Sequence, residues 1–228
     1  MNCLIELHYL PSIAYFSTLQ AAEKIIIEKH EHFVKQSYRN RCHTLTAQGI
    51  KRLVIPLTSK HARLPALRIP TLSGGGGPDG QGKVLITDVR IDYSQKWLNN
   101  HWRTIESAYR NAPFFEFYAD DLKKTLFRHH TFLYDLNFEL LTICLKWLKR
   151  DVTLQESITY EKKPANGVID MRNVIHAKKI EQHANYFRPV AYPQVFGSKF
   201  VEGLSLVDLV FSEGPDSRKV VALSAKPH

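Results

Sequence analysis

Residues 2–28 read NCLIELHYLPSIAYFSTLQAAEKIIIE, and this stretch indicates the fold class. The apolar residues near its start predict a strand over residues 2–10, which ends before Pro11 because proline lacks a backbone N–H. Residues 16–23 predict a short helix, and the β-branched run over residues 24–28 predicts a buried strand. A strand, a helix and a second strand at this spacing are typical of a βαβ unit with a parallel strand pair.

The residues that follow predict a β-hairpin. Residues 38–45 and 48–57 have the composition of strands, and Ala47-Gln48-Gly49 indicates a turn of about three residues between them. A further strand pattern covers residues 83–93. The glycine-rich stretch 73–82 predicts a mobile insertion, because a phosphate-binding loop requires Lys-Ser/Thr at the start of a helix and this stretch leads into a strand pattern.

The second part of the chain has helical patterns. Apolar residues recur at helical spacing over residues 94–111, and further helices are expected over residues 120–127, 131–149 and 204–211. Residues 151–203 show no strong periodicity, and so long an irregular stretch is often functional. Residues 217–228 are expected to fray or to add an edge strand.

These patterns predict one α/β domain over residues 1–228. Residues 1–93 would form a mixed β-sheet with a Rossmann-like βαβ start and a hairpin, and residues 94–228 a mostly helical part.

The chain is basic, with a formal net charge of +9 over 228 residues. A positive excess favours anionic partners, so we expect a nucleotide or nucleotide sugar, with RNA as another candidate. No run of five Lys or Arg residues occurs, so the sequence carries no duplex-DNA-binding tail. No cofactor is indicated.

The three cysteines, Cys3, Cys42 and Cys144, form no C-x-x-C pair, so neither a disulfide framework nor a structural zinc site is expected. The histidines form no H-E-x-x-H motif, and we predict no metal site. No apolar run approaches the roughly 18 residues of a membrane span, and no signal peptide is recognisable. A cytoplasmic location is therefore expected.

Candidate site residues begin with His8, at the expected carboxyl end of the first strand, where open α/β sheets bind ligands. His8 could act as a general base or contact phosphate, or it could steady the turn by a local hydrogen bond. Tyr9 could stack on a base or sugar, or belong to the core. Arg41 and His43 project from one face of their strand and could bind an anion, with Asn40 beside them.

Five further polar residues are candidates. His101 lies at the edge of the apolar stripe of its helix and could be a base or a partly buried core residue. Asp170 and Arg172 could pair, or Arg172 could bind a diphosphate with Lys178 nearby. Asp208 lies among apolar residues, so we expect a structural partner such as Arg172 or Arg41, and a catalytic role as the alternative. No G-x-S-x-G nucleophile elbow is present.

Several motifs in this order resemble the WbqC-like family of bacterial proteins. They are Leu7 to Phe16, Tyr38-Arg39-Asn40-Arg41, Trp102 to Phe115, Asp170-Met171-Arg172 with His176 and Lys178-Lys179, Tyr192 to Phe196, and Leu204 to Pro215. Many members carry Gln-Pro where this chain has Leu7-His8, and the glycine-rich stretch 73–82 has no expected counterpart.

The resemblance implies a setting in surface-polysaccharide synthesis. With the basic charge, it leads to the hypothesis of a transferase, acyl or aminoacyl, that acts on a nucleotide-linked sugar. His8, His101 and Asp208 would be catalytic, and Arg41 and Arg172 would hold phosphate. The alternative is a non-catalytic binding module for a nucleotide, RNA or a partner protein. The enzyme hypothesis predicts that these residues meet in one cleft.

Overall fold

The computed structural model describes residues 1–58, 83–177 and 184–226. The fold class is confirmed: a parallel sheet with helices, an antiparallel hairpin and a helical C-terminal part. The expected Gly-rich insertion 73–82 and Lys178 lie outside the described residues.

A four-stranded parallel sheet is built around the N-terminal βαβ unit. It contains β1 (Asn2–Ile5), β2 (Lys24–Ile27), β5 (Thr153–Glu156) and β6 (Val168–Asp170), in the order β5-β2-β1-β6. Helix α1 (Ile13–Thr18) connects β1 to β2, which pair in parallel with Cys3 opposite Ile25. The predicted parallel pair is therefore confirmed.

The bounds within this unit differ from the prediction. β1 ends at Ile5 rather than Leu10, because the chain then turns away from the sheet, with Leu10 at φ +43°. Helix α1 begins at Ile13 rather than residue 16, because the Ser12 hydroxyl caps it by accepting the N–H of Tyr15.

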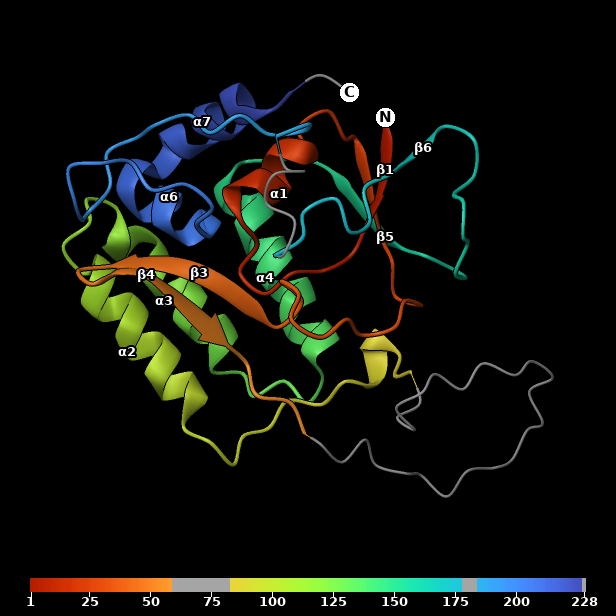
Figure 1. The fold of residues 1–228 in the computed structure, drawn as a ribbon, viewed down its shortest axis with the longest axis horizontal. Coiled ribbons are helices and arrows are strands. Elements are labelled where there is room, and N and C mark those ends of the chain that lie inside the picture. Colours follow the sequence, from red (N-terminus) through yellow and green to blue (C-terminus); the bar gives the residue numbers. More distant parts are fainter. Residues whose placement is uncertain (59–82, 178–183, 227–228) are drawn as a thin grey trace.

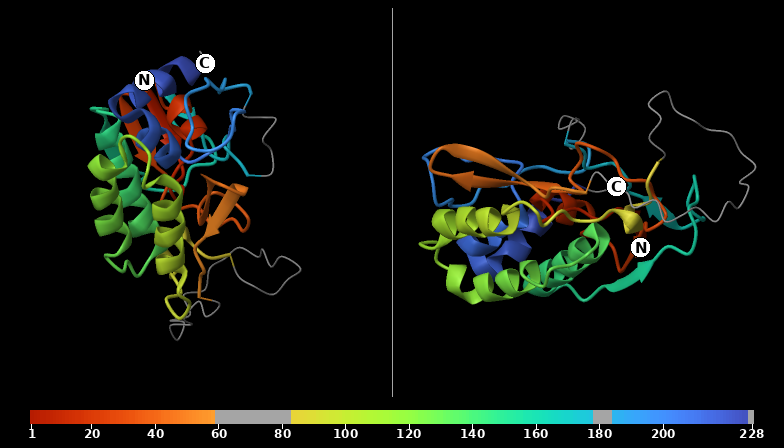
Figure 2. Two further views of the ribbon diagram at one scale, coloured as in Figure 1. Left: turned by 90° about the vertical axis from the view of Figure 1, so that its left-hand side faces the viewer. Right: turned by 90° about the horizontal axis from the view of Figure 1, so that it is seen from below.

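The hairpin consists of β3 (Arg41–Thr46) and β4 (Gly49–Val54). Thr46 pairs with Gly49, so the turn contains two residues rather than the expected three. Gly49 has φ +98°, which glycine adopts at little cost. The hairpin lies across helix α2 (Trp97–Tyr109), outside the parallel sheet (Figures 1 and 2).

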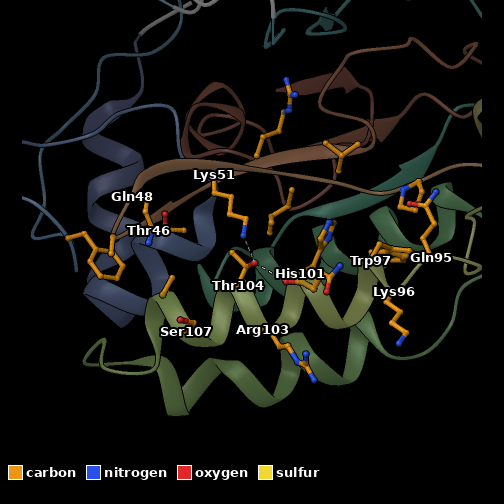
Figure 3. A pocket seen from close by; sticks show the side chains of 18 residues that line it. Thr46, Gln48, Lys51, Gln95, Lys96, Trp97, His101, Arg103, Thr104 and Ser107 are labelled. Atoms are coloured by element: carbon orange, nitrogen blue, oxygen red, sulfur yellow. Dashed lines mark hydrogen bonds between the residues drawn. The ribbon is translucent and has the colours of Figure 1, made fainter.

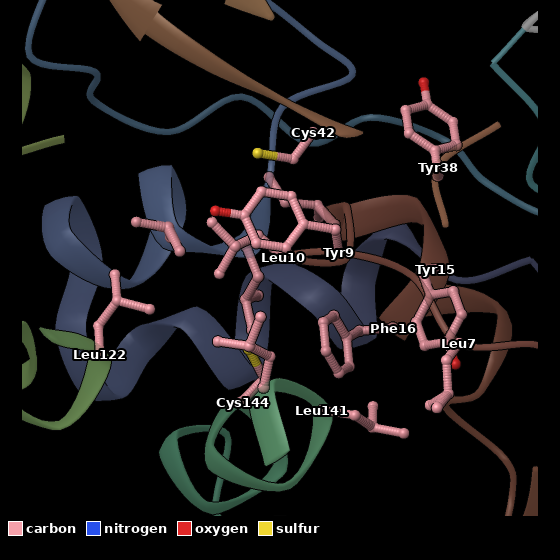
Figure 4. Close-up of a cluster of buried hydrophobic side chains, with 14 of the residues drawn as sticks. Leu7, Tyr9, Leu10, Tyr15, Phe16, Tyr38, Cys42, Leu122, Leu141 and Cys144 are labelled. Atoms are coloured by element: carbon pink, nitrogen blue, oxygen red, sulfur yellow. The ribbon is translucent and has the colours of Figure 1, made fainter. Parts of the chain in front are cut away.

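The other helices are α3 (Phe115–Leu126), α4 (Leu133–Trp147), α6 (Leu206–Glu213) and α7 (Ser217–Ser224). Two short 3-10 turns cover Ile86–Asp88 and Gly214–Asp216. The buried apolar core continues from the sheet through α1 to α3, α4 and α6, and Figure 4 shows part of it around Tyr9, Leu10 and Phe16.

Three sequence predictions of secondary structure were wrong. Residues 83–93 form a 3-10 turn and isolated bridges instead of a strand, because their N–H and C=O groups bond to separate loops and a helix start. The third helix begins at Phe115, five residues before the expected start at Asp120. Residues 217–224 form helix α7, which buries Val221 and accepts a hydrogen bond from Ser17 at the Val221 carbonyl.

No helix within the described residues is long and apolar enough to cross a membrane.

Candidate functional site

Charged side chains gather at the carboxyl edge of the parallel sheet, directly after β1 and β2. Glu6 follows β1, and its carboxylate faces the Nε2 of His8 at 3.1 Å and accepts the N–H of Asn173 at 2.9 Å. Arg39 donates two hydrogen bonds to Glu31, at 2.7 and 2.5 Å, and its guanidinium lies 3.9 Å from Glu6. We call these residues the sheet-edge cluster; Glu6, His8 and Arg39 are each 1% exposed.

The pKa of Glu6 shows that its charge is well compensated. Burial raises this pKa, but the hydrogen bond and charge of His8, the charge of Arg39 and the Asn173 N–H outweigh burial and lower it to about 2. Burial lowers the pKa of His8, against the effect of Glu6. With His8 neutral and donating from Nε2 to Glu6, Nδ1 carries the lone pair, and this buried atom has no partner among the described residues.

A second ion-pair network extends the cluster toward β5 and β6. Arg172 donates to both carboxylate oxygens of Asp170, at 2.9 and 2.8 Å, and to Glu28 at 2.9 Å. Glu28 also accepts a hydrogen bond from Ser157 at 2.8 Å. The predicted pairing of Asp170 with Arg172 is therefore present, and all four strands contribute a residue at or just after their carboxyl ends.

A large cavity lies elsewhere, between the hairpin and α2. This hairpin–helix groove has a volume of about 1020 Å³. Its lining mixes apolar and polar side chains and includes no Asp or Glu among the described residues. The polar ones include Thr46, Gln48, Lys51, Arg52, Gln95, Lys96, Asn100, Arg103, Thr104 and Ser107. Lys51 points from β4 toward α2 and donates to the Thr104 hydroxyl at 3.2 Å, whereas Lys96 and Arg103 extend away from the hairpin (Figure 3).

His101 lines this groove but is only 5% exposed. Its Nδ1 lies 2.9 Å from the hydroxyl of Tyr9, and its ring also bonds to the backbone carbonyl of Val54. Burial lowers the pKa of His101 to about 4, and nearby Lys51 acts in the same direction. His101 is thus neutral at pH 7 with both ring nitrogens engaged, and its ring contacts Trp97 edge-on at 5.1 Å.

Asp208 is fully buried on α6 and is held by hydroxyl and amide donors. Tyr109 and Tyr192 donate to it at 2.8 and 2.5 Å, and Gln194 at 3.3 Å. Burial raises its pKa, and these three hydrogen bonds oppose that effect. The expectation of Arg172 or Arg41 as its partner was wrong, because three neutral donors satisfy the carboxylate and Arg172 is paired with Asp170 and Glu28.

The remaining predicted residues lie on the hairpin and at its entry. Arg41 and His43 line a second cavity of about 430 Å³. Asn40 is buried and donates to the Ile55 carbonyl at 2.9 Å.

The predicted residues therefore occupy four neighbourhoods instead of one cleft. His8, Asp170 and Arg172 belong to the sheet edge, and His101 lines the groove with buried Tyr9 bonded to it. Arg41 and His43 line the second cavity, and Asp208 is buried on α6.

The sequence profile of the WbqC-like protein family matches residues 7–72 and 77–184, which is most of the chain. The chain belongs to this family. The break in the match falls inside the glycine-rich stretch 73–82 that we expected to be an insertion. Among curated proteins, the uncharacterized protein Rv1507c of Mycobacterium tuberculosis is 27% identical over 159 residues, which is 69% of this chain and 60% of that protein. No solved structure matches the chain.

The matched residues include His8 and Arg39 of the sheet-edge cluster and the hairpin and α2 that line the groove. Glu6 lies just before the match, and Phe196 of the groove, Asp208 and its partner Tyr192 lie beyond it. Several contributors were missed from the sequence. Glu6 and Glu28 each follow an apolar strand directly, which was the available signal. Lys51 and Trp97 stand in a strand and a helix pattern without any local feature that marks a cavity.

Proposed function

We propose that this protein of the WbqC-like family binds a nucleotide-linked sugar in the hairpin–helix groove. The observation that carries the proposal is the lining of the groove. Hydroxyl and amide side chains supply donors and acceptors for sugar hydroxyls, and Lys51 supplies a positive charge for a phosphate. The Nε1 of Trp97 is buried without a partner among the described residues, which leaves one more donor at the wall.

The reaction we propose is acyl or aminoacyl transfer to such a ligand, within bacterial surface-polysaccharide synthesis in the cytoplasm. The family membership and the basic charge support this setting. Of the predicted catalytic residues, His101 lines the groove but has both ring nitrogens engaged. His8 lies at the buried sheet edge, so its role as proton acceptor requires a ligand that reaches that edge. The carboxylate of Glu6 fixes its tautomer, and Nδ1 retains an unused lone pair.

A non-catalytic binding module is the second candidate, and one observation favours it. His8, His101 and Asp208 are 1%, 5% and 0% exposed, so none of them meets solvent as the fold stands. Under this reading the groove recognises a nucleotide, an RNA segment or a partner protein.

The binding step can be tested by thermal shift and calorimetry with a panel of nucleoside diphosphate sugars and the matching free nucleotides. We expect saturable binding that Lys51→Ala weakens about tenfold, because a hydrogen bond to a charged group contributes about 1.5 kcal/mol or more. Lys219→Ala on α7 removes the same charge from an exposed site and should leave binding unchanged. If no member of the panel binds the folded protein, the proposed ligand class is wrong.

The choice between enzyme and binding module needs a chemical readout. Incubation of the bound sugar nucleotide with acyl and aminoacyl donors, followed by mass spectrometry, should reveal a covalent product if the protein is a transferase. The binding module would be favoured if the protein binds single-stranded RNA but no sugar nucleotide, and if the affinity for RNA falls steeply as the salt concentration rises.

A further inference from the structure

The outer face of the hairpin carries a compact group of cationic side chains. Arg41, His43 and Arg52 share this face because alternate residues of a strand point the same way and because His43 pairs directly with Arg52 across the ladder. Lys51, the next residue along β4, points to the opposite face, toward α2 (Figure 3). The cavity of about 430 Å³ above this outer face is therefore distinct from the hairpin–helix groove, although both cavities touch Arg52 and Val54.

Positive charge in this cavity is uncompensated within the part of the chain that the structure describes. The lining, Gln36, Arg41, His43, Arg52, Val54 and Ala177, includes no Asp or Glu, and no described carboxylate forms an ion pair with Arg41 or Arg52. By contrast, Arg39 and Arg172 each form an ion pair with a carboxylate, Glu31 and Glu28 respectively. This difference indicates that Arg41, His43 and Arg52 are available to bind an anion from solution.

Arg41, His43 and Arg52 lie close enough to repel one another. Burial and the charge of Arg52 lower the pKa of both Arg41 and His43. In addition, the Nε of Arg41 is buried and has no hydrogen-bond partner among the described residues, although arginine donors seldom remain unused. An anion that accepts from Arg41 would satisfy this donor and relieve the repulsion.

We propose that Arg41, His43 and Arg52 form a phosphate-binding site on the outer face of the hairpin. A guanidinium presents a planar pair of donors that matches two phosphate oxygens, and two of them with an imidazole can surround a dianion. One ring nitrogen of His43 bonds to the backbone of Gly203, which orients the ring and leaves the other nitrogen for the ligand. The site extends the proposed function, because it does not depend on a sugar nucleotide in the groove.

The phosphate could be free or could be the terminal phosphate of a nucleotide. Both sources share the same chemistry, and Arg52 is placed where the two cavities adjoin. A nucleotide that spans both cavities would depend on Arg41 and Lys51 together, whereas free phosphate would depend on Arg41 alone.

The test is an NMR titration of the intact protein with inorganic phosphate at constant ionic strength. The readout is the ring proton resonance of His43, assigned by its loss in His43→Gln. We expect a saturable shift and a higher pKa of His43 in the bound state, because an anion stabilises the protonated ring. Arg41→Gln should weaken phosphate binding at least tenfold. Lys219→Ala, at an exposed site on α7, should leave it unchanged.

A second titration with a nucleoside monophosphate distinguishes the two sources. If both Arg41→Gln and Lys51→Ala weaken its binding, one nucleotide spans the two cavities. If only Arg41→Gln weakens it, the site recognises the phosphate group alone. Each variant is first checked for its fold by circular dichroism, and Arg52→Gln provides a second removal of charge if Arg41→Gln does not fold. The inference is overturned if phosphate gives no saturable shift, if chloride at equal ionic strength reproduces the shift, or if Lys219→Ala weakens the binding of free phosphate as much as Arg41→Gln does.

Discussion

Replacement of Glu6 by Gln tests whether the sheet-edge cluster holds an ionised carboxylate inside the protein. The pKa of Glu6 is about 2 in the folded protein against an ordinary value of 4.5. At about 1.4 kcal/mol per pH unit, ionised Glu6 stabilises the fold by about 3 kcal/mol at neutral pH. Gln has nearly the same shape but lacks the charge that His8 and Arg39 face, so Glu6→Gln should lower the free energy of unfolding by about this amount at pH 7.

The pH dependence follows from the direction of this change. Because the folded pKa lies below the unfolded one, the stabilisation is fully present above about pH 4.5 and is lost as the pH falls toward 2. The difference between the parent and Glu6→Gln should therefore shrink to about 1 kcal/mol at pH 3.

Urea denaturation at pH 7, 5 and 3 measures these differences directly. Glu116→Gln, at an exposed position in the first turn of α3, is a matched control and should change stability by less than about 0.5 kcal/mol. If the loss of unfolding free energy in Glu6→Gln stays constant from pH 7 to pH 3, Glu6 is not an ionised carboxylate with a lowered pKa. A deficit equal to that of Glu116→Gln would refute the role of Glu6 altogether.

Three further predictions concern other parts of the fold. Tyr192→Phe removes one donor from buried Asp208 and should cost about 2 kcal/mol in urea denaturation; no loss would mean that the other donors suffice. Gly214→Ala should destabilise the protein by more than about 1 kcal/mol, because the new Cβ would lie 2.4 Å from the ring of Phe114 at a backbone φ of +52°; an unchanged melting temperature would contradict this. Lys149→Gly should raise stability by about 0.5 to 1 kcal/mol, because Lys149 directly follows the C-cap of α4 at φ +49°, where glycine is preferred; calorimetry that shows a loss would contradict it.

The βαβ unit and the central helices could be predicted from the sequence because their apolar residues follow a clear period. Ile25 and Ile27 are completely buried in β2, and the stripe of α2 through Ile105 and Tyr109 faces the core as its spacing indicates. Strands β5 and β6 could not be found in this way. They are the two edge strands of the sheet, with sequences TLQE and VID, and edge strands that are partly exposed need no apolar run.

The sequence indicated which types of residue could form a site, but it did not predict which of them lie close together in the fold. The sequence left two alternatives for Arg172, a pair with Asp170 or a diphosphate ligand, and the structure contains the pair, since two residues two positions apart in an extended segment share a side. The partners of Asp208 are 99 and 16 residues away, at Tyr109 and Tyr192, and no local pattern connects them. The distribution of the histidines over separate neighbourhoods depends on how the hairpin crosses α2, which is a tertiary property that short motifs do not encode.

In the motif Tyr38-Arg39-Asn40-Arg41, one arginine forms ion pairs inside the protein and the other is available to a ligand. Arg39 turns inward to the sheet edge, where open α/β sheets commonly bind ligands, and there it meets Glu31 and Glu6. At that edge the charged side chains pair with one another. Arg41, two residues later, lies on the outer face of the hairpin with no carboxylate partner among the described residues. The hairpin thus carries cationic groups on both faces of β4, with Lys51 directed toward α2 and Arg52 on the outer face, and each face borders one of the two cavities.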